Sequence, residues 1–494
     1  MSSKILFWIN GSLTSFCIAY ALQKKINADF YTVIDSYDKP KVFFQNQNLV
    51  KFQKTWFYHD YFQNMNKPDL KYLADFEKKY NLNLWELAIN ERIFYRFNSV
   101  YNFSSDEILS IIEHESKLFD EIITESNPDF LIMFEPTLHQ EELLYRMCKK
   151  RGIKILLLNQ ANTSRSIISE NPRKIDIDIN LEKLESSHKN FDELKLFKNS
   201  FNNYDNIKNY RNNFKVSNFE LLKAAIHFFL SKNEHIKTHY THRGRTKIQV
   251  LKDEIQKKIK RKFRYSFINN NLETKIDFHE KFIYFPLGVD EEKNLLINAP
   301  FYTNQLEVIR SIAKSLPVGY KLYVKENPGQ VVRYWRSTSE YKEIMNIPNV
   351  RLIHPNFSTE KIYKKCSLVI TISGTSGLDA AFYEKPAIIF SDLGYSVLPS
   401  VSRLNNIEEL SNLILESLQK KVSSDDLDKY IKILHDNSFN FNPMDFENKV
   451  NQFFYYDGHN LSVEISENKM KMFLEQNKSI IDNLACEFER KINQ

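Results

Sequence analysis

Short apolar runs and stretches of helical periodicity alternate along the first part of the chain. The runs at 5–10, 30–34, 129–134 and 153–159 predict buried strands. Between them, the spacing of apolar residues predicts helices at 69–80, 83–97, 105–126 and 139–151. Such alternation is typical of a mostly parallel sheet covered by helices.

A second block of the same kind follows a basic helix predicted at 246–267. Its predicted strands are 281–287, 320–326, 350–353, 367–372 and 387–390, and its predicted helices are 302–315, 339–346, 358–365, 376–384 and 406–420. Residues 165–245 are polar and rich in Asn and Lys, and they predict a helical insertion in the first block. An amphipathic segment at 463–490 closes the chain.

The fold class predicted from this pattern is α/β, with two Rossmann-like domains facing each other across a cleft. We expect an N-terminal domain at 1–270, a C-terminal domain at 271–420, and final helices at 421–494 that pack back across the domain seam. A chain of 494 residues is too long for one core, which agrees with two domains.

The composition indicates the type of protein and its cellular compartment. With 42% hydrophobic and 26% charged residues the chain resembles a soluble globular protein, and a net charge of +6 does not indicate nucleic acid binding. The four cysteines are far apart, which argues against a disulfide framework and favours a reducing compartment. The apolar stretch 5–22 is interrupted by polar residues and is better interpreted as strand, turn and helix than as a targeting segment. We therefore expect a cytoplasmic protein.

Glycine is scarce, with ten in the whole chain, yet two of them lie close together in SGTSG at 373–377. This turn follows a predicted strand and precedes a predicted helix, where unpaired backbone N–H groups favour an anion. Gly374 and Gly377 would allow close approach to the backbone, and Ser373, Thr375 and Ser376 could donate hydroxyl hydrogen bonds. The turn matches neither GxGxxG nor GxxxxGK[ST], and the alternative is a tight turn with a capping serine.

Other polar residues end the neighbouring predicted strands. Lys325, Glu326 and Asn327 follow one strand and His354 follows the next. Because the carboxyl ends of parallel strands converge, these residues and SGTSG would surround one crevice suited to the phosphate of a nucleotide sugar. Each residue alone could equally cap a strand.

Several short segments resemble the capsule polysaccharide synthesis glycosyltransferases, a GT-B-like family that includes Kdo transferases. They are FPL (285–287), NQLEVI (304–309), VKENP (324–328), HPN (354–356), TISGTSGLDAAFYEKPAII (371–389) and GRTK (244–247). The resemblance covers about 280–400 well and extends to 84–97 and 129–156. Two positions depart from the family pattern, since Asn327 replaces a histidine and Asp379 replaces a glutamate.

The resemblance implies a metal-independent glycosyltransferase of GT-B type. It would move a sugar from a CMP- or UDP-linked donor to a surface or capsular polysaccharide or its lipid-linked precursor, with no cofactor other than this substrate. The implied donor-binding residues are Lys325, Glu326, Asn327, His354, Ser373, Gly374, Thr375, Ser376, Gly377 and Asp379. Asp379 would contact the ribose. Glu135 and His139, which follow the strand at 129–134, are the candidates for the catalytic base, unless Glu135 caps a helix and His139 packs on its first turn.

Two other functions stay open: a nucleotide-sugar epimerase of the UDP-GlcNAc 2-epimerase type, and a non-catalytic assembly or glycan-binding protein. No metal site is predicted, because DID (176–178) lacks a preceding strand and the histidines at 235, 239 and 242 lie among basic residues. The basic helix at 247–264 is typical of a solvated face and would also attract anionic lipid at the inner face of a cell membrane.

Overall fold

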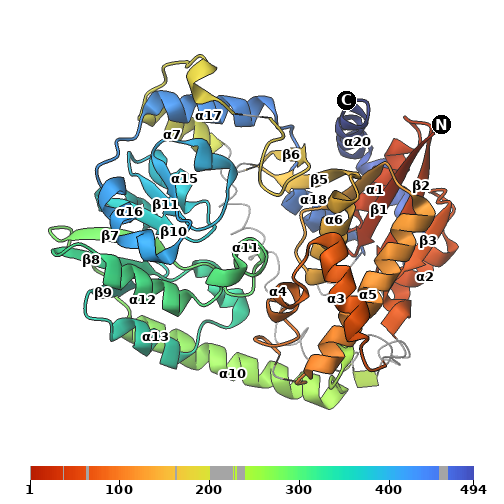
Figure 1. The fold of residues 1–494 in the computed structure, drawn as a ribbon, viewed down its shortest axis with the longest axis horizontal. Coiled ribbons are helices and arrows are strands. Elements are labelled where there is room, and N and C mark those ends of the chain that lie inside the picture. The colour runs from red at the N-terminus through yellow and green to blue at the C-terminus, as the bar shows by residue number, and fades with distance from the viewer. Residues whose placement is uncertain are drawn as a thin grey trace. The chain divides into compact units, whose positions relative to one another are not determined.

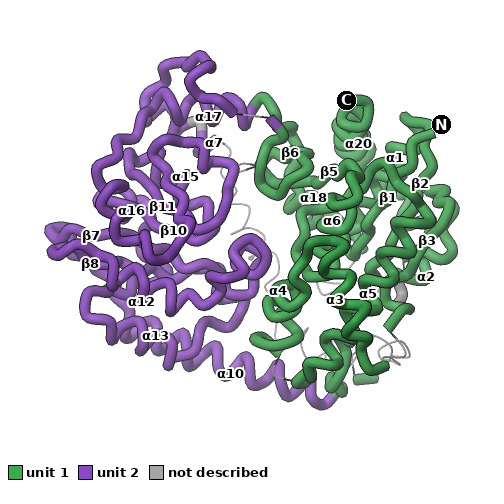
Figure 2. The backbone as a smooth tube through the Cα atoms, in the orientation of Figure 1, with its two compact units in different colours: residues 1–176, 201–247, 436–494 green, residues 177–200, 248–435 purple. Residues whose placement is uncertain are grey.

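The structure is a computed structural model, and it describes residues 2–494 except 37, 63–65, 99, 162–163, 178, 201–225, 227–228, 231–239 and 455–464. The chain forms two compact units (Figure 2). Unit 1 comprises residues 1–176, 201–247 and 436–494, and unit 2 comprises 177–200 and 248–435. Each unit contains one six-stranded sheet.

The sheet of unit 1 has the strand order β3-β2-β1-β4-β5-β6. Its strands are β1 (Ser3–Asn10), β2 (Ala28–Asp35), β3 (Lys54–Phe57), β4 (Phe130–Phe134), β5 (Lys154–Gln160) and β6 (Ser166–Ser169). All neighbours pair in parallel except β5 and β6, which are antiparallel. The order reverses between β1 and β4, which defines a Rossmann-type switch point at their carboxyl ends.

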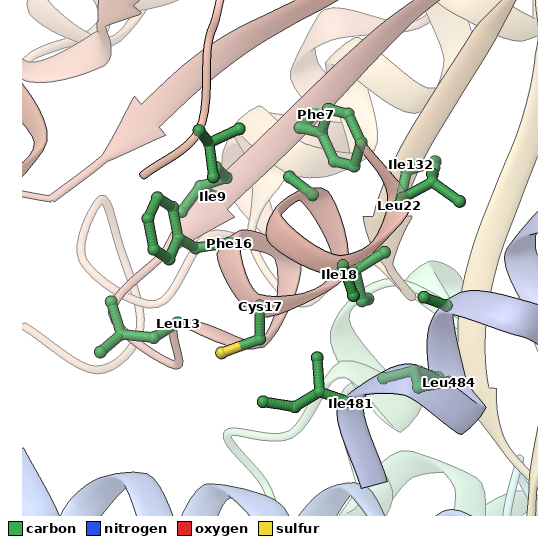
Figure 3. Packing of buried hydrophobic residues seen from close by; sticks show 14 of the residues in the cluster. Phe7, Ile9, Leu13, Phe16, Cys17, Ile18, Leu22, Ile132, Ile481 and Leu484 are labelled. Carbon is green, nitrogen blue, oxygen red and sulfur yellow. The ribbon is translucent and has the colours of Figure 1, made fainter. Parts of the chain in front are cut away.

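Helices cover both faces of this sheet. One face packs against α1 (Thr14–Leu22), α2 (Asp38–Asn46), α18 (Pro443–Phe454), α19 (Glu467–Gln476) and α20 (Lys478–Ile492). Figure 3 shows Cys17 and Ile18 of α1 beside Ile481 and Leu484 of α20, with Phe7 of the sheet on the other side of α1. The apolar character of α1 on all sides follows from this position between two layers.

The opposite face of the unit 1 sheet carries α3 (Leu70–Tyr80), α4 (Leu84–Ile89), α5 (Ser105–Ser126) and α6 (His139–Lys150). Short 3-10 helices η1 (Tyr58–Phe62) and η3 (Tyr240–His242) join the same core through Tyr58 and Tyr240. A capping box between Ser104 and Glu107 fixes the start of α5.

The sheet of unit 2 has the order β12-β11-β10-β7-β8-β9 and is parallel throughout. Its strands are β7 (Lys281–Pro286), β8 (Tyr320–Lys325), β9 (Val350–Ile353), β10 (Leu368–Thr371), β11 (Ala387–Ile389) and β12 (Val401–Arg403). Here the switch point lies between β7 and β10.

Helices surround this second sheet as well (Figure 1). They are α7 (Phe191–Ser200), α10 (Lys247–Asn271), α11 (Lys293–Leu296), α12 (Gln305–Ser315), α13 (Thr338–Met345), α14 (Thr359–Lys365), α15 (Ser376–Ala381), α16 (Leu410–Ser417) and α17 (Ser424–Asp436). Further short 3-10 helices are η2 (Leu181–Lys183), η4 (Pro300–Tyr302), η5 (Pro328–Arg333), η6 (Gly394–Val397) and η7 (Ile407–Glu409).

The predicted α/β class with two Rossmann-like sheets and helical C-terminal residues is confirmed. Three short strands were not predicted: β3, β6 and β12 have three or four residues each, too few to show an apolar pattern. The helix predicted at 83–97 ends at Ile89, and Glu91 instead turns its carboxylate toward His139. Packing across a domain seam stays a prediction.

Candidate functional site

The carboxyl edge of the unit 2 sheet collects most of the residues expected to bind a donor. Lys325 ends β8, His354 follows β9, and Ser373 to Gly377 follow β10. The strand register supports this convergence. The last paired residues of β7 and β8 are Pro286 and Lys325, and the last paired residues of β8 and β9 are Lys325 and Ile353. These ends flank the switch point, where Rossmann-type sheets bind ligands.

Lys325 is a buried cation, with 5% of its surface exposed. Among the described residues, no carboxylate oxygen lies within 4.0 Å of its Nζ, and none accepts a hydrogen bond from it. Burial lowers the pKa of Lys325 to about 8, and the charge of Glu326 offsets part of that shift. An ammonium in this setting gains from any anion that reaches it.

His354 is locked in one tautomer. Its Nδ1 accepts a hydrogen bond from the Asn356 N–H at 3.1 Å, so its Nε2 donates to Oδ1 of Asn269 at 3.0 Å. Burial lowers the pKa of His354, and the charge of Lys325 lowers it further. The ring is therefore neutral at pH 7 and does not supply a second positive charge.

Glu326 serves the scaffold of this edge. Its carboxylate is fully buried and accepts hydrogen bonds from Arg336 Nε at 2.9 Å and from the Tyr341 hydroxyl at 2.7 Å. Arg336 in turn pairs with Asp290 and donates to the Gly288 carbonyl at 2.5 Å. This buried network joins the end of β8 to the loop that follows β7.

Gln305 fixes the same loop from α12. Its amide oxygen accepts from the Gly288 N–H at 2.7 Å, while its amide nitrogen donates to Asp290 at 2.7 Å. Gln305 belongs to the segment NQLEVI, and these bonds hold the backbone of the loop after β7. Arg336 and Asp290 were not predicted, because no short motif surrounds them in the sequence.

Asn327, which replaces the family's histidine, caps the 3-10 helix η5. Its side-chain oxygen accepts the Gly329 N–H at 2.8 Å. The substitution thus has a structural explanation within the turn itself.

The SGTSG turn owes its glycines to packing rather than to backbone torsion. Positive φ angles occur at Gly152, Gly244 and Gly319, and not at Gly374 or Gly377. A Cβ on Gly374 would lie 2.8 Å from Oγ1 of Thr371, and one on Gly377 would lie 2.8 Å from the Tyr395 hydroxyl. Both glycines are therefore required by the close approach of a neighbouring side chain, and neither by a left-handed backbone.

The hydroxyl groups of the turn are partly engaged. Ser373 donates to the Asn294 carbonyl, and the Tyr395 hydroxyl donates to the Gly374 carbonyl. Thr375 and Ser376 open the short helix α15 without a side-chain cap from Thr375. The interpretations as a turn and as a phosphate cradle both fit this geometry.

Asp379, expected to contact a ribose, forms an ion pair with Lys198 of α7, with Oδ1 and Nζ 2.6 Å apart. Lys198 Nζ also lies 4.9 Å from the ring centroid of Phe382. Both side chains are 29% exposed, so the carboxylate stays accessible from solvent.

In unit 1, Glu135 follows β4 at the switch point of that sheet. It is buried, and its Oε1 lies 3.9 Å from Nε of Arg173. In the first turn of α6, the Glu141 carboxylate accepts the N–H groups of Thr137 at 2.7 Å and of the N-cap residue Leu138 at 3.3 Å.

His139 lies between two buried carboxylates. Its Nδ1 is 2.7 Å from Glu91 and its Nε2 is 2.9 Å from Glu115. Burial disfavours the charged ring, but the two carboxylates outweigh it and raise the pKa of His139 to about 10. An imidazolium has no lone pair to accept a proton, so the geometry does not suit a catalytic base.

Two tyrosines extend this cluster. The Tyr58 hydroxyl donates to Glu115 at 2.5 Å, and it lies 3.0 Å from the Tyr240 hydroxyl. Tyr240 precedes the GRTK segment, in which Gly244 has φ +71° and approaches Val100 and Tyr101. The segment at 244–247 thus begins beside the loop that precedes α5.

The structure adds a pair that the sequence did not suggest. Nε2 of His59 lies 2.8 Å from Oδ1 of Asp35, the last residue of β2. Such a pair orients the imidazole at the carboxyl edge of the sheet. The two residues are 24 positions apart, and β3 was not predicted, so no spacing signal connects them.

Among the described residues, no group of three or more His, Cys, Asp or Glu side chains could hold a metal ion. Asp178, His235 and His239 lie outside those residues. Within the same limits, no helix is long and apolar enough to cross a membrane.

A family model described as "Capsule polysaccharide biosynthesis protein" matches residues 195–426. The match spans the unit 2 sheet and its carboxyl edge, and it confirms the family resemblance predicted from the sequence. A search of curated proteins gives no match.

Solved structures that match this chain include the UDP-GlcNAc 2-epimerase from Methanocaldococcus jannaschii, at 13% identity and a TM-score of 0.25 over 88% of this chain and 99% of the other. Another is KpsC from Thermosulfurimonas dismutans, a β-Kdo 2,7 transferase, at 12% identity and a TM-score of 0.28 over 72% and 97%. A third is Anabaena Alr3699/HepE in complex with UDP, at 11% identity and a TM-score of 0.28 over 91% and 98%. These TM-scores are too low to carry functional conclusions to this chain.

Proposed function

We propose that this protein is a glycosyltransferase that moves a sugar from a CMP- or UDP-linked donor to a surface polysaccharide or its lipid-linked precursor. The observation that carries the proposal is Lys325, a buried ammonium at the carboxyl edge of a Rossmann sheet within the segment that matches the capsule family. Its setting favours an anionic ligand, and a nucleotide phosphate has the required charge.

In this mechanism, the acceptor hydroxyl oxygen bonds to the anomeric carbon as the bond from that carbon to the donor phosphate breaks. The nucleotide leaves with the bonding electron pair, and Lys325 stabilises the negative charge that develops on it. Backbone N–H groups of residues 375–377, which follow β10, would add further donors. Asp379 would share a ribose hydroxyl with its partner Lys198.

If transfer inverts the anomeric centre, a general base takes the acceptor proton. We assign this role to Glu135 rather than His139, because Glu135 is a carboxylate at the switch point and His139 is already protonated. The oriented imidazole of His59 is the competing base. Replacing Glu135 by Gln or His59 by Gln would separate the two, since only loss of the true base lowers kcat while nucleotide affinity is kept.

The direct test incubates the protein with CMP- and UDP-linked sugars, with and without capsular oligosaccharide acceptors, and follows release of free nucleotide. Acceptor-dependent release that survives EDTA supports a metal-independent transferase. Conversion of a UDP-sugar without any acceptor would favour the epimerase instead. No nucleotide binding at all would favour a non-catalytic protein.

A further inference from the structure

The long helix α10 presents an apolar stripe to solvent. Ile248, Ile255, Ile259 and Phe263 are 70%, 60%, 50% and 72% exposed. Their spacings of seven, four and four residues place all four on one face of an α-helix. Single exposed apolar residues are ordinary on a protein surface, but four in a row along one helix are not.

The opposite face of α10 holds the helix to unit 2. Ile268 is fully buried, and Arg264 donates to the carbonyls of Tyr334 and Trp335 at 3.2 and 2.6 Å. Lys257 lies over the Tyr334 ring, 5.6 Å from its centroid. The stripe is therefore not the face through which the helix packs on its own domain.

The net charge of α10 is strongly positive. The basic residues of this helix are Lys247, Lys252, Lys257, Lys258, Lys260, Arg261, Lys262 and Arg264. Its only acidic residues, Asp253 and Glu254, both pair with Lys257 on the packed face, at 2.6 and 3.2 Å. Lys252 lies within the apolar stripe, and Lys258 and Lys262 border it.

We propose that α10 is a membrane-docking helix that lies in the plane of an anionic lipid surface, with the apolar stripe inserted among the acyl chains. Lysines beside an apolar face are the combination by which interfacial helices bind bilayers, because the stems cover apolar surface while the ammonium groups reach lipid phosphates. A protein partner would need a groove that is both acidic and apolar. An anionic bilayer offers negative charge and an apolar interior along the whole length of the helix. The proposal does not depend on the glycosyltransferase assignment.

The test is flotation of the full chain with vesicles of phosphatidylcholine alone or mixed with phosphatidylglycerol. We expect binding to the mixed vesicles only, and weaker binding at high salt. The triple variant Ile255→Gln/Ile259→Gln/Phe263→Gln should bind about tenfold more weakly or worse, because it removes the inserted apolar surface. Phe301→Gln, which changes a residue that is 81% exposed outside α10, should bind like the wild type.

Charge is tested separately. Lys258→Gln/Lys262→Gln should lower binding about fivefold per lysine at low salt, while Lys314→Gln/Lys342→Gln on other helices should have less effect. Single stripe variants should give graded losses, which guards against a folding defect in the triple variant. Wild-type affinity in the triple variant overturns the proposal, as does absence of wild-type binding to mixed vesicles. A wild-type oligomer that the triple variant converts to monomer, without vesicle binding, would assign the stripe to a second copy of the chain.

Discussion

Lys325 and His354 lie at the carboxyl ends of the adjacent strands β8 and β9, and the charge of Lys325 helps to keep His354 neutral. Burial lowers the pKa of both residues. The edge therefore has one titratable cation rather than two, and that cation is Lys325. Under the proposed function, donor binding would therefore depend on the ammonium group of Lys325.

Nucleotide affinity should fall as the pH rises above about 8, because the pKa of Lys325 without ligand is about 8 and only the protonated amine attracts phosphate. The loss approaches tenfold per pH unit until the pKa of the bound form is reached. Calorimetric titration with UDP or CMP between about pH 7 and pH 9 measures it. Lys325→Met should give a flat profile, and an equally steep profile in that variant would assign the titration to another group.

Protonation of His139 should stabilise unit 1. Its pKa is raised from 6.5 to about 10, so its contribution is complete below pH 6.5 and is lost as the pH rises toward about 10. The loss amounts to at most about 1.4 kcal/mol per pH unit. Lys325 has the opposite effect. Because its pKa is lowered to about 8 in the folded protein, stability rises with pH between about 8 and 10.5, the ordinary pKa of a lysine.

Denaturant unfolding of the Lys325→Met variant between about pH 6.5 and pH 10 measures the contribution of His139 to stability without that of Lys325. We expect stability to decline with pH in that variant, and the decline to disappear when His139→Gln is added. His139→Gln should itself cost several kcal/mol, about 3–5, because it leaves Glu91 and Glu115 buried without their cation. A decline that survives His139→Gln would contradict this account.

Arg336→Met should destabilise unit 2 by about 3–5 kcal/mol, because Glu326 and Asp290 then remain buried without a counter-charge. Arg310, which pairs with Glu307 and Glu343 at the surface, provides the matched control, and Arg310→Met should cost much less than Arg336→Met. Urea unfolding distinguishes them. Equal costs for the two variants would show that the buried network adds little.

Gly377→Ala should destabilise the protein by about 1–3 kcal/mol, since its Cβ would lie 2.8 Å from the hydroxyl and 2.9 Å from Cε2 of Tyr395. Tyr395→Phe removes the nearest of these atoms, so the two substitutions should be less costly together than their sum. A double-mutant cycle of unfolding free energies measures the coupling. Strict additivity would show that Tyr395 is not what excludes a side chain.

The sequence predicted the two sheets well because their longer strands are apolar runs between helical patterns, as at β1 and β8. It also placed Lys325, His354 and SGTSG at one edge, since that follows from strand ends in a parallel sheet. It did not predict that Glu326 and Asn327 would serve the scaffold, because their partners Arg336 and Gly329 meet them only through loop geometry. His139 likewise depends on Glu91 and Glu115, which come from separate elements.

The central claim, that Lys325 holds the donor phosphate, is tested most directly by Lys325→Met. Nucleotide affinity and the Tm of the ligand-free protein are measured side by side, with Lys321→Met on the same strand as the control. We predict a loss of about one to two decades in affinity, from a charge-assisted contact of about 1.5–3 kcal/mol. The Tm should not fall, because an unpaired buried charge opposes folding. Unchanged affinity together with a lower Tm would contradict the claim and make Lys325 a structural residue.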